Sequence, residues 1–199
     1  MITKRQEEER TFRRRKIMDG ALSVFAKMSS DQVTMADIAR ESGFGKATLY
    51  YYFKSKEEII NALLIEGWQE LWDCIEPVLE TGGTAKETFI LVLQTIGNQI
   101  EKKRSLYTFL FNAPNIIPVS EGKIPEWKMY QDRLYTVLRG ILEEGIAKAE
   151  FPRLDSGILM RGIGGLFHGL FFLGSRPRTI TKDHIETMLN GIFSTNEQA

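Results

Sequence analysis

The chain has 199 residues, with 26 Lys and Arg balanced by 26 Asp and Glu, and it contains a single cysteine. This length admits one large helical domain or a small module joined to a larger one. One cysteine excludes an internal disulfide, and the two histidines make no recognisable zinc spacing with it. We therefore expect neither a metal nor a cofactor.

The charges are distributed unevenly along the chain. Residues 1–56 carry twelve Lys and Arg against seven Asp and Glu, a net charge of +5 that the remainder cancels. The first segment is the part expected to meet a polyanion, unless the imbalance is a chance fluctuation. The first residues lack the apolar run of a signal peptide, and the most apolar stretch, 158–174, is shorter than the roughly 20 residues that span a bilayer. We expect a cytoplasmic protein with no membrane segment.

The N-terminal part repeats its apolar residues at the helical period, which predicts a first helix over 12–28. Thr34 then precedes the run MADIARES, and Asp37 follows Thr34 by three residues. This pattern is close to a capping box and predicts the start of a second, short helix. Gly43 interrupts the pattern, and KATLYYYF resumes it as a third short helix over 46–53.

Ser55 is a good N-cap for a long fourth helix, which is predicted to run to about Val78 and to close near Gly82 and Gly83. Further helices are predicted over 84–103, 105–112, 125–148, 155–174 and 181–193. The stretch 113–124 contains two prolines and is expected to form one long loop. No segment alternates at the strand period, so the predicted fold class is all-α.

Two short helices joined by a glycine turn in a basic segment suit the DNA major groove, because the groove admits one helix and the other must brace it. Ile38 and Ala39 on the second helix are expected to pack on Leu49 of the third. Gly43 can take a positive φ at the turn without steric cost. The outward face of the third helix then presents hydrogen-bond donors for phosphates or base edges, namely Lys46, Thr48, Tyr50 and Tyr51.

The stretch VTMADIARESGFGKATLYYYFKSKEEII resembles the signature of the tetracycline-repressor (TetR) family, and the likeness covers about 10–70. The threonine start, D-I-A, the glycine turn, T-L-Y, Y-F and K-S-K-E all occur in order. The resemblance implies a three-helix helix-turn-helix DNA-binding domain over 10–55 and a helical regulatory, ligand-binding and dimerisation domain over 56–199. It also implies homodimers that bind palindromic operators in double-stranded DNA.

The resemblance further implies roles for individual residues. Thr34 is similar to the family's phosphate-contacting cap, and Lys56 to its contact with the DNA backbone at the start of the fourth helix. The contacts of the recognition helix correspond to Lys46, Thr48, Tyr50 and Tyr51. Ser29 and Ser30 depart from the usual glycine and aromatic after the first helix, and Gly45 departs from the usual capping serine. Because glycine caps only slightly worse than serine, the fold should survive while a phosphate contact is lost.

Glycines recur in the apolar helix expected at 155–174. Glycines inside a helix lower its stability, so their number suggests a face pressed against another helix. Together with 181–193, this helix is expected to form a dimer interface through Gly162, Gly165, Leu166, Gly169, Ile185 and Leu189. Core packing within one subunit is the alternative, and His168 is interpreted as a core or interface residue.

The resemblance implies that the body of the protein binds a small molecule. Pockets for such molecules are mostly apolar and aromatic, so aromatic residues on the central helices are candidates for its wall. These candidates are Trp68, Trp72, Phe89, Phe109, Phe111, Trp127 and Tyr130. The alternative is that they only fill the core. Cys74 is interpreted as a packing residue, because a redox sensor would need a lowered pKa.

The sequence thus predicts a homodimeric repressor that binds a palindromic operator and is released by a small apolar or aromatic effector. The fourth helix is expected to connect the effector pocket to the DNA-reading helices as one rigid piece. Control by a protein partner and action as an activator are the alternatives. An enzyme on a helical scaffold is disfavoured, because neither histidine has a Ser, Cys or carboxylate at a recognised catalytic spacing.

Overall fold

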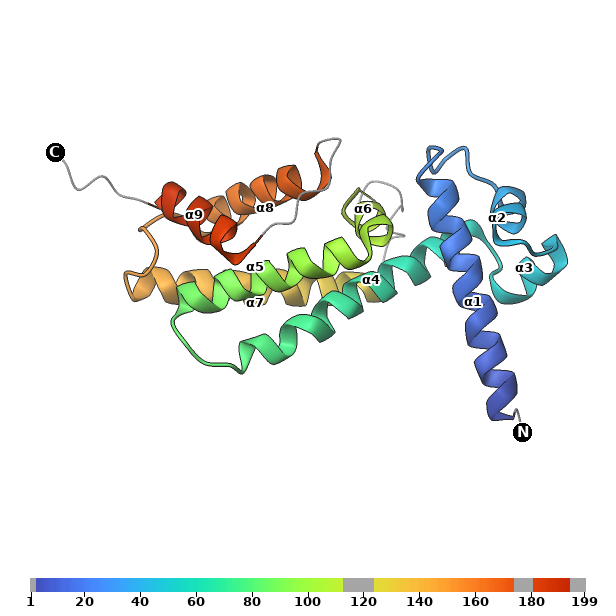
Figure 1. Ribbon diagram of the computed structural model, residues 1–199, viewed down its shortest axis with the longest axis horizontal. Helices are drawn as coiled ribbons and strands as arrows, with labels where there is room; N and C mark the ends of the chain where they lie inside the picture. The colour runs from blue at the N-terminus through green and yellow to red at the C-terminus, as the bar shows by residue number, and fades with distance from the viewer. Residues whose placement is uncertain (1–2, 113–123, 174–180, 194–199) are drawn as a thin grey trace. The chain divides into compact units, whose positions relative to one another are not determined.

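A computed structural model describes residues 3–112, 124–173 and 181–193 (Figure 1). All regular structure within these ranges is helical, which confirms the predicted all-α class. The helices are α1 (Lys4–Phe25), α2 (Met35–Ser42), α3 (Lys46–Tyr52), α4 (Lys56–Leu79), α5 (Ala85–Lys102), α6 (Arg104–Asn112), α7 (Glu126–Ala147), α8 (Ser156–Phe172) and α9 (Lys182–Phe193). The loop predicted over 113–124 lies almost entirely outside the described residues.

The chain divides into two compact units. Unit 1 comprises Met1–Gly67 and Arg104–Trp127, and unit 2 comprises Trp68–Lys103 and Lys128–Ala199. Unit 1 is larger than the DNA-binding domain expected over 10–55. The reason is that Ile59 and Leu63 of α4 and Leu106 of α6 are buried in the same apolar cluster as the first three helices. Helix α4 continues without a break from unit 1 into unit 2.

Side-chain caps determine where several helices begin. Thr34 starts α2 with the predicted capping box, and Thr84 starts α5 in the same way. A third capping box lies at the start of α1, where the Thr3 hydroxyl accepts from the backbone N–H of Gln6 and the Gln6 side chain accepts from the Thr3 N–H. Neither this box nor that of Thr84 was predicted. The box of Thr3 starts α1 at Lys4, eight residues before the predicted start. The spacing of apolar residues did not predict the first turns of α1, because the residues in these turns are polar and exposed.

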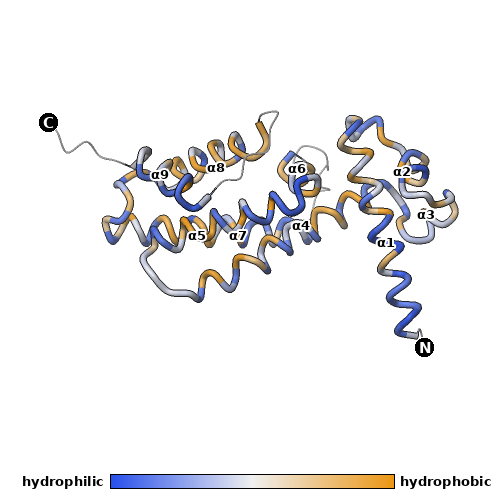
Figure 2. Tube along the Cα trace, in the orientation of Figure 1, coloured by the Kyte–Doolittle hydropathy of each residue, from blue (hydrophilic) through white to orange (hydrophobic). Residues whose placement is uncertain are grey.

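The core of unit 1 gathers the apolar faces of its helices. As predicted, Ile38 and Ala39 of α2 are buried with Leu49 of α3. The side chains in this core with no exposed surface are Ile17, Ala21, Ile38, Leu49, Phe53 and Ile59. The C-terminal part of α1 carries apolar residues, whereas its first turns are hydrophilic (Figure 2). Only the second half of α1 therefore contributes to this core.

Gly20 lets α1 and α2 approach each other closely. A Cβ atom at Gly20 would lie 2.8 Å from Ser42 Cβ, 2.9 Å from Ser42 N and 3.0 Å from Ser42 Cα. Two of these atoms belong to the backbone of α2, so they cannot rotate away. Gly20 is therefore the small residue that the contact between α1 and α2 requires.

Gly20→Ala is expected to destabilise the protein despite the better helix propensity of alanine. The propensity gain is about 1 kcal/mol, whereas overpacking against backbone costs about 1 to 3 kcal/mol. The difference is a net loss of up to about 2 kcal/mol in the free energy of unfolding, measured by urea denaturation. Gly140→Ala on α7 is the matched control, because a Cβ there meets nothing within 4 Å. Equal or greater stability of Gly20→Ala would contradict the close approach.

Unit 2 is built on the second half of α4 and on α5, α7, α8 and α9. Phe89 of α5, Leu142 of α7 and Leu189 of α9 have no exposed surface. Helix α4 ends at Leu79 and is followed by Gly82 and Gly83, whose φ angles of 71° and 126° favour glycine. None of the helices in the described ranges is long and apolar enough to cross a membrane.

Candidate DNA-binding surface

The N-terminus of α2 is fixed by a network between Thr34 and Asp37. The Thr34 hydroxyl accepts from the Asp37 N–H at 3.2 Å and donates to the Asp37 carboxylate at 2.6 Å. The hydroxyl and backbone N–H of Thr34 donate to this carboxylate and hold the pKa of Asp37 below its usual range. The charged carboxylate also suits the positive end of the helix dipole. Thr34 is exposed at this helix end, where the sequence placed a phosphate contact.

The turn between α2 and α3 has the predicted geometry. Gly43 adopts φ 72° and ψ 24°, the left-handed conformation in which a side chain would be strained. The Phe44 N–H donates to the carbonyl of Ala39 at 3.0 Å, and the Gly43 N–H donates to that of Arg40 at 3.2 Å. These bonds satisfy the last carbonyl groups of α2 and fix the direction in which the chain continues into α3.

Helix α3 buries one face and exposes the other. Leu49 has no exposed surface, whereas Tyr50 is 47% and Tyr51 70% exposed. Lys46 is also exposed, and Thr48 is half-buried. Gly45 caps α3 without a side-chain hydrogen bond, and a Cβ there would meet nothing within 4 Å. The exposed face thus offers an ammonium and two phenol groups to a ligand outside the protein.

Lys56 is joined to the loop that follows α1. Its Nζ donates to the carbonyl oxygen of Ser30 at 2.6 Å. An ammonium has three donors, so two remain available for a phosphate while the first fixes the side chain. The sequence indicated Lys56 but not its partner, because a contact to a backbone carbonyl 26 positions away leaves no sequence pattern.

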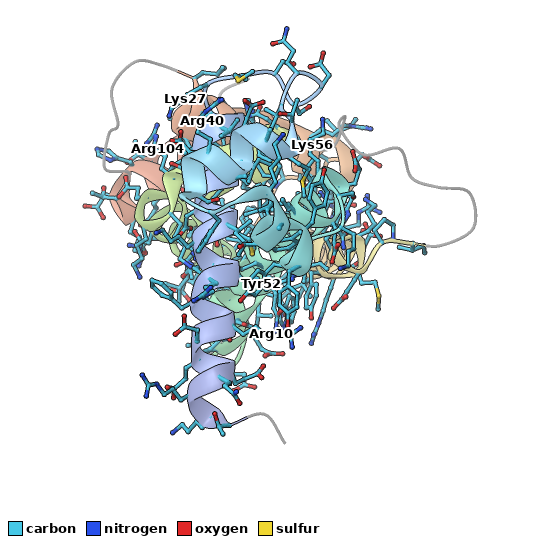
Figure 3. All side chains as sticks on the ribbon, turned by 90° about the vertical axis from the view of Figure 1, so that its right-hand side faces the viewer. Arg10, Lys27, Arg40, Tyr52, Lys56 and Arg104 are labelled. Carbon is cyan, nitrogen blue, oxygen red and sulfur yellow. The ribbon has the colours of Figure 1, made fainter. Side chains whose placement is uncertain are left out.

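Arg14 connects α1 to the end of α3 and was not predicted. Its guanidinium lies 4.2 Å from the centre of the Phe53 ring, and it donates to the carbonyl oxygen of Tyr52 at 3.5 Å. The basic run before the apolar stripe of α1 was the available signal. Figure 3 shows Tyr52 next to Arg10 on α1 and, apart from them, Lys56.

The aromatic residues predicted to line a pocket are distributed over both units. In unit 2, Trp68, Trp72 and Phe89 are at most 5% exposed, and Tyr130 is half-buried. The Trp72 ring stacks on the guanidinium of Arg133 at 3.7 Å. Their burial fits both the pocket and the core interpretation.

The other predicted pocket residues, Phe109, Phe111 and Trp127, belong to unit 1. Phe109 stacks on Phe25 of α1 with ring centres 4.9 Å apart, and both rings line a half-open cavity of about 530 Å³ between α1 and α6. Trp127 is 6% exposed, and its indole N–H has no hydrogen-bond acceptor among the described residues. A buried donor of this kind costs about 1 to 3 kcal/mol until an acceptor reaches it.

Helix α8 has two apolar faces with different surroundings. One face is buried in unit 2 and consists of Leu159, Ile163, Phe167 and Phe171. The other carries exposed side chains, with Ile158 at 58% and Leu166 and Leu170 at 44%, and Leu173, which caps the helix, is 71% exposed. Gly162 and Gly165 are exposed as well, and Gly169 is half-buried.

Ile185 and Leu189 of α9 were predicted to lie in the same interface as the α8 glycines. They are 1% and 0% exposed in a single subunit, so their side chains already pack inside it. Helical periodicity indicates that these side chains pack against another element, but not whether that element belongs to the same subunit or to a second one. The sequence therefore did not distinguish core packing from a dimer interface. The burial of Ile185 and Leu189 fits the alternative of packing within one subunit, whereas α8 keeps exposed apolar side chains.

The described residues contain no group of three or more His, Cys, Asp or Glu side chains that could hold a metal ion. Burial raises the pKa of the Cys74 thiol, and its Sγ contacts the carbonyl of Leu71 at 3.1 Å. A redox-sensing cysteine needs the opposite shift in pKa. His168 is half-buried, with its ring centre 5.3 Å from that of Phe172.

Known proteins match the region that contains this surface. The sequence model of a family described as "Bacterial regulatory proteins, tetR family" matches residues 17–63. The "Fatty acid metabolism regulator protein" of Bacillus subtilis (strain 168) is 33% identical over 142 residues, 67% of this chain and 68% of that protein. The "HTH-type transcriptional repressor KstR2" of Mycolicibacterium smegmatis is 26% identical over 153 residues, 76% of this chain and 74% of that protein.

Solved structures share the fold over most of the chain. The ketosteroid transcriptional regulator KstR2 of Mycobacterium tuberculosis has a TM-score of 0.75 at 19% identity, covering 91% of this chain and 93% of its own. A TetR-family transcriptional regulator from Bordetella parapertussis 12822 has a TM-score of 0.76 at 17% identity, covering 94% and 96%. At this identity the likeness shows the fold alone.

Proposed function

Because the chain belongs to the TetR family and is therefore a DNA-binding transcriptional regulator, not an enzyme, we propose that it is a homodimeric repressor of a palindromic operator. A small, largely apolar effector releases it from the DNA. The observation that carries this proposal is the exposed face of α3. Lys46, Tyr50 and Tyr51 project from a helix that Leu49 and the Gly43 turn hold in place.

The exposed face of α8 supports a homodimer. Four large apolar side chains and two glycines lie on a surface that nothing in the described part of the subunit covers. Contiguous exposed apolar surface of this kind marks an interaction site. In a twofold dimer the same face of each subunit meets its copy, and glycines permit two helix backbones to come close. Two DNA-binding units related by a twofold axis match a palindrome.

The relatives and the aromatic residues support an apolar effector. One relative is named for fatty acid metabolism and a similar structure for ketosteroids, both of which are largely hydrocarbon. Trp68 and Trp72 lie on α4, the same helix that begins with Lys56 at the DNA-binding surface. In unit 1, the indole N–H of Trp127 has no acceptor among the described residues and would be satisfied by an acceptor atom on an effector.

The proposal is tested by titrating full-length protein against labelled duplex DNA from both sides of its own gene, with fluorescence anisotropy as the readout. We expect one duplex to bind more tightly than an unrelated duplex of equal length, and both affinities to fall as salt rises. Equal affinity for every duplex at all salt concentrations would overturn the proposed sequence-specific regulation.

Lys56→Ala is expected to weaken binding by a similar factor on every duplex, because phosphate contacts position the protein without reading sequence. The slope of log affinity against log salt should decrease in magnitude by about 0.9 for one lost phosphate contact. Lys56→Arg should retain the slope, and Lys148→Ala, an exposed change in unit 2, is the matched control. Loss of preference at a single base position would instead make Lys56 a base-reading residue.

A further inference from the structure

The first turns of α1 precede the residues that the family model matches. Helix α1 begins at Lys4, whereas the match to the family begins at residue 17. These turns project past α2 and α3 in unit 1 and are hydrophilic (Figures 1 and 2). We call residues 4–13 of α1 the N-terminal arm. It contributes nothing to the apolar core, so its order and its position need another explanation.

An open groove separates the arm from the end of the recognition helix. Its volume is about 660 Å³, and Tyr51 and Tyr52 of α3 form one wall. The other wall consists of Arg5, Gln6, Glu9, Arg10 and Arg13. These five positions follow one another at helical spacing and therefore form a single face of α1. Figure 3 shows Arg10 and Tyr52 beside each other in this part of the molecule.

The wall on α1 is positively charged after its internal ion pair is counted. Arg13 pairs with Glu9 at 2.6 Å, and this pair neutralises the charge of the only carboxylate that lines the groove. Arg5 and Arg10 are exposed and have no ion pair within the described residues. Glu7 and Glu8 do not line the groove. The groove therefore presents two uncompensated guanidinium groups.

The helix of the arm is capped at its start and anchored at its base. The capping box of Thr3 and Gln6 orders its first turn, with the Thr3 N–H donating to Gln6 Oε1 at 2.8 Å. At its base, Arg14 stacks on Phe53 and donates to the carbonyl of Tyr52. A groove wall that is ordered before binding does not lose this conformational entropy on binding.

We propose that the N-terminal arm and the end of α3 form a clamp for the DNA backbone beside the bases that α3 reads. This inference rests on the proposed function. Arg5 and Arg10 neutralise two phosphates of one strand, and the phenol of Tyr51 contacts the same backbone from the opposite wall. Duplex DNA is the polyanion within reach, because Tyr51 belongs to the recognition helix itself.

The spacing of the two arginines suits this ligand. Five residues along a helix span about 7.5 Å at 1.5 Å per residue. Successive phosphates of one strand rise by about 3.4 Å along the duplex axis and are also displaced around it, so two guanidinium groups on flexible side chains can reach neighbouring phosphates of the same strand. Guanidinium can bind phosphate through two parallel hydrogen bonds, which fixes the backbone as well as neutralising it.

The test compares full-length wild type with the double variant Arg5→Ala/Arg10→Ala on the duplex from its own gene and on an unrelated duplex. Alanine is the best helix former, so the arm keeps its helix. We expect the salt slope to decrease in magnitude by about 1.8 for two lost phosphates, with a similar loss of affinity on both duplexes. Arg5→Lys/Arg10→Lys should retain the slope, because the charge remains.

Lys4→Ala is the matched control, since Lys4 is an exposed cation of the arm that does not line the groove. If Lys4→Ala changes the slope by half as much as the double variant does, the effect is one of general charge and the clamp is overturned. An unchanged slope in the double variant also overturns it. In that case, tight and salt-dependent binding by the wild type shows that the proposed function stands. A wild type that binds no duplex refutes the proposed function instead.

Discussion

Gly165→Leu on α8 is expected to convert the proposed dimer into monomers. A Cβ at Gly165 meets nothing within 4 Å among the described residues, so the added side chain begins in open space and we expect the single chain to keep its fold. Across a twofold axis, however, the added side chain would hold apart the two α8 helices that we propose to touch. The exposed Leu166 and Leu170 would then lose their partners as well.

Monomers should bind the operator about 10² to 10⁴ times more weakly, because the second half-site no longer benefits from the effective concentration that dimerisation gives. Sedimentation equilibrium measures the assembly and anisotropy measures the affinity. Gly140→Leu is the matched control: it adds the same side chain to an open position on α7 and should remain dimeric. A Gly165→Leu variant that stays dimeric would place the interface elsewhere.

The helices could be predicted closely because their signals are local. Thr34 with Asp37 at the start of α2, the positive φ of Gly43, and the glycines after α4 all depend on neighbouring residues. The start of α1 was missed because a capping box of Thr3 and Gln6 acts without an apolar stripe. Gly20 was missed for another reason. Its importance depends on Ser42, and no local pattern reports that contact between two helices.

The candidate site was predictable to the same extent. The inward Leu49 and the outward tyrosines of α3 follow from helical periodicity, since one face must pack. The bond from Lys56 to Ser30 and the stacking of Arg14 on Phe53 join residues far apart in sequence, so only the fold reveals them. Which aromatic residues contact an effector is still a prediction, because core and pocket share the same composition.

Effector and operator are expected to weaken each other's binding by the same factor. Helix α4 has 24 residues, about 36 Å at 1.5 Å per residue, and it carries both Lys56 and Trp72. An effector that shifts Trp72 must therefore move the rest of this helix or bend it. We expect a coupling of about 1 to 3 kcal/mol, a change of roughly 5- to 150-fold in operator affinity. Reciprocity then requires an equal loss of effector affinity on operator DNA.

The probes for this experiment are fatty acids of graded chain length and steroids, titrated with and without the operator duplex while tryptophan fluorescence is followed. Trp72→Phe is preferable to Trp72→Ala, because truncating a buried tryptophan costs about 3 to 5 kcal/mol of stability. Trp72→Phe should reduce the release caused by the effector while unliganded operator affinity stays the same. If a probe that binds the free protein binds the operator complex equally well, α4 does not couple the two sites, and repression must be relieved in another way.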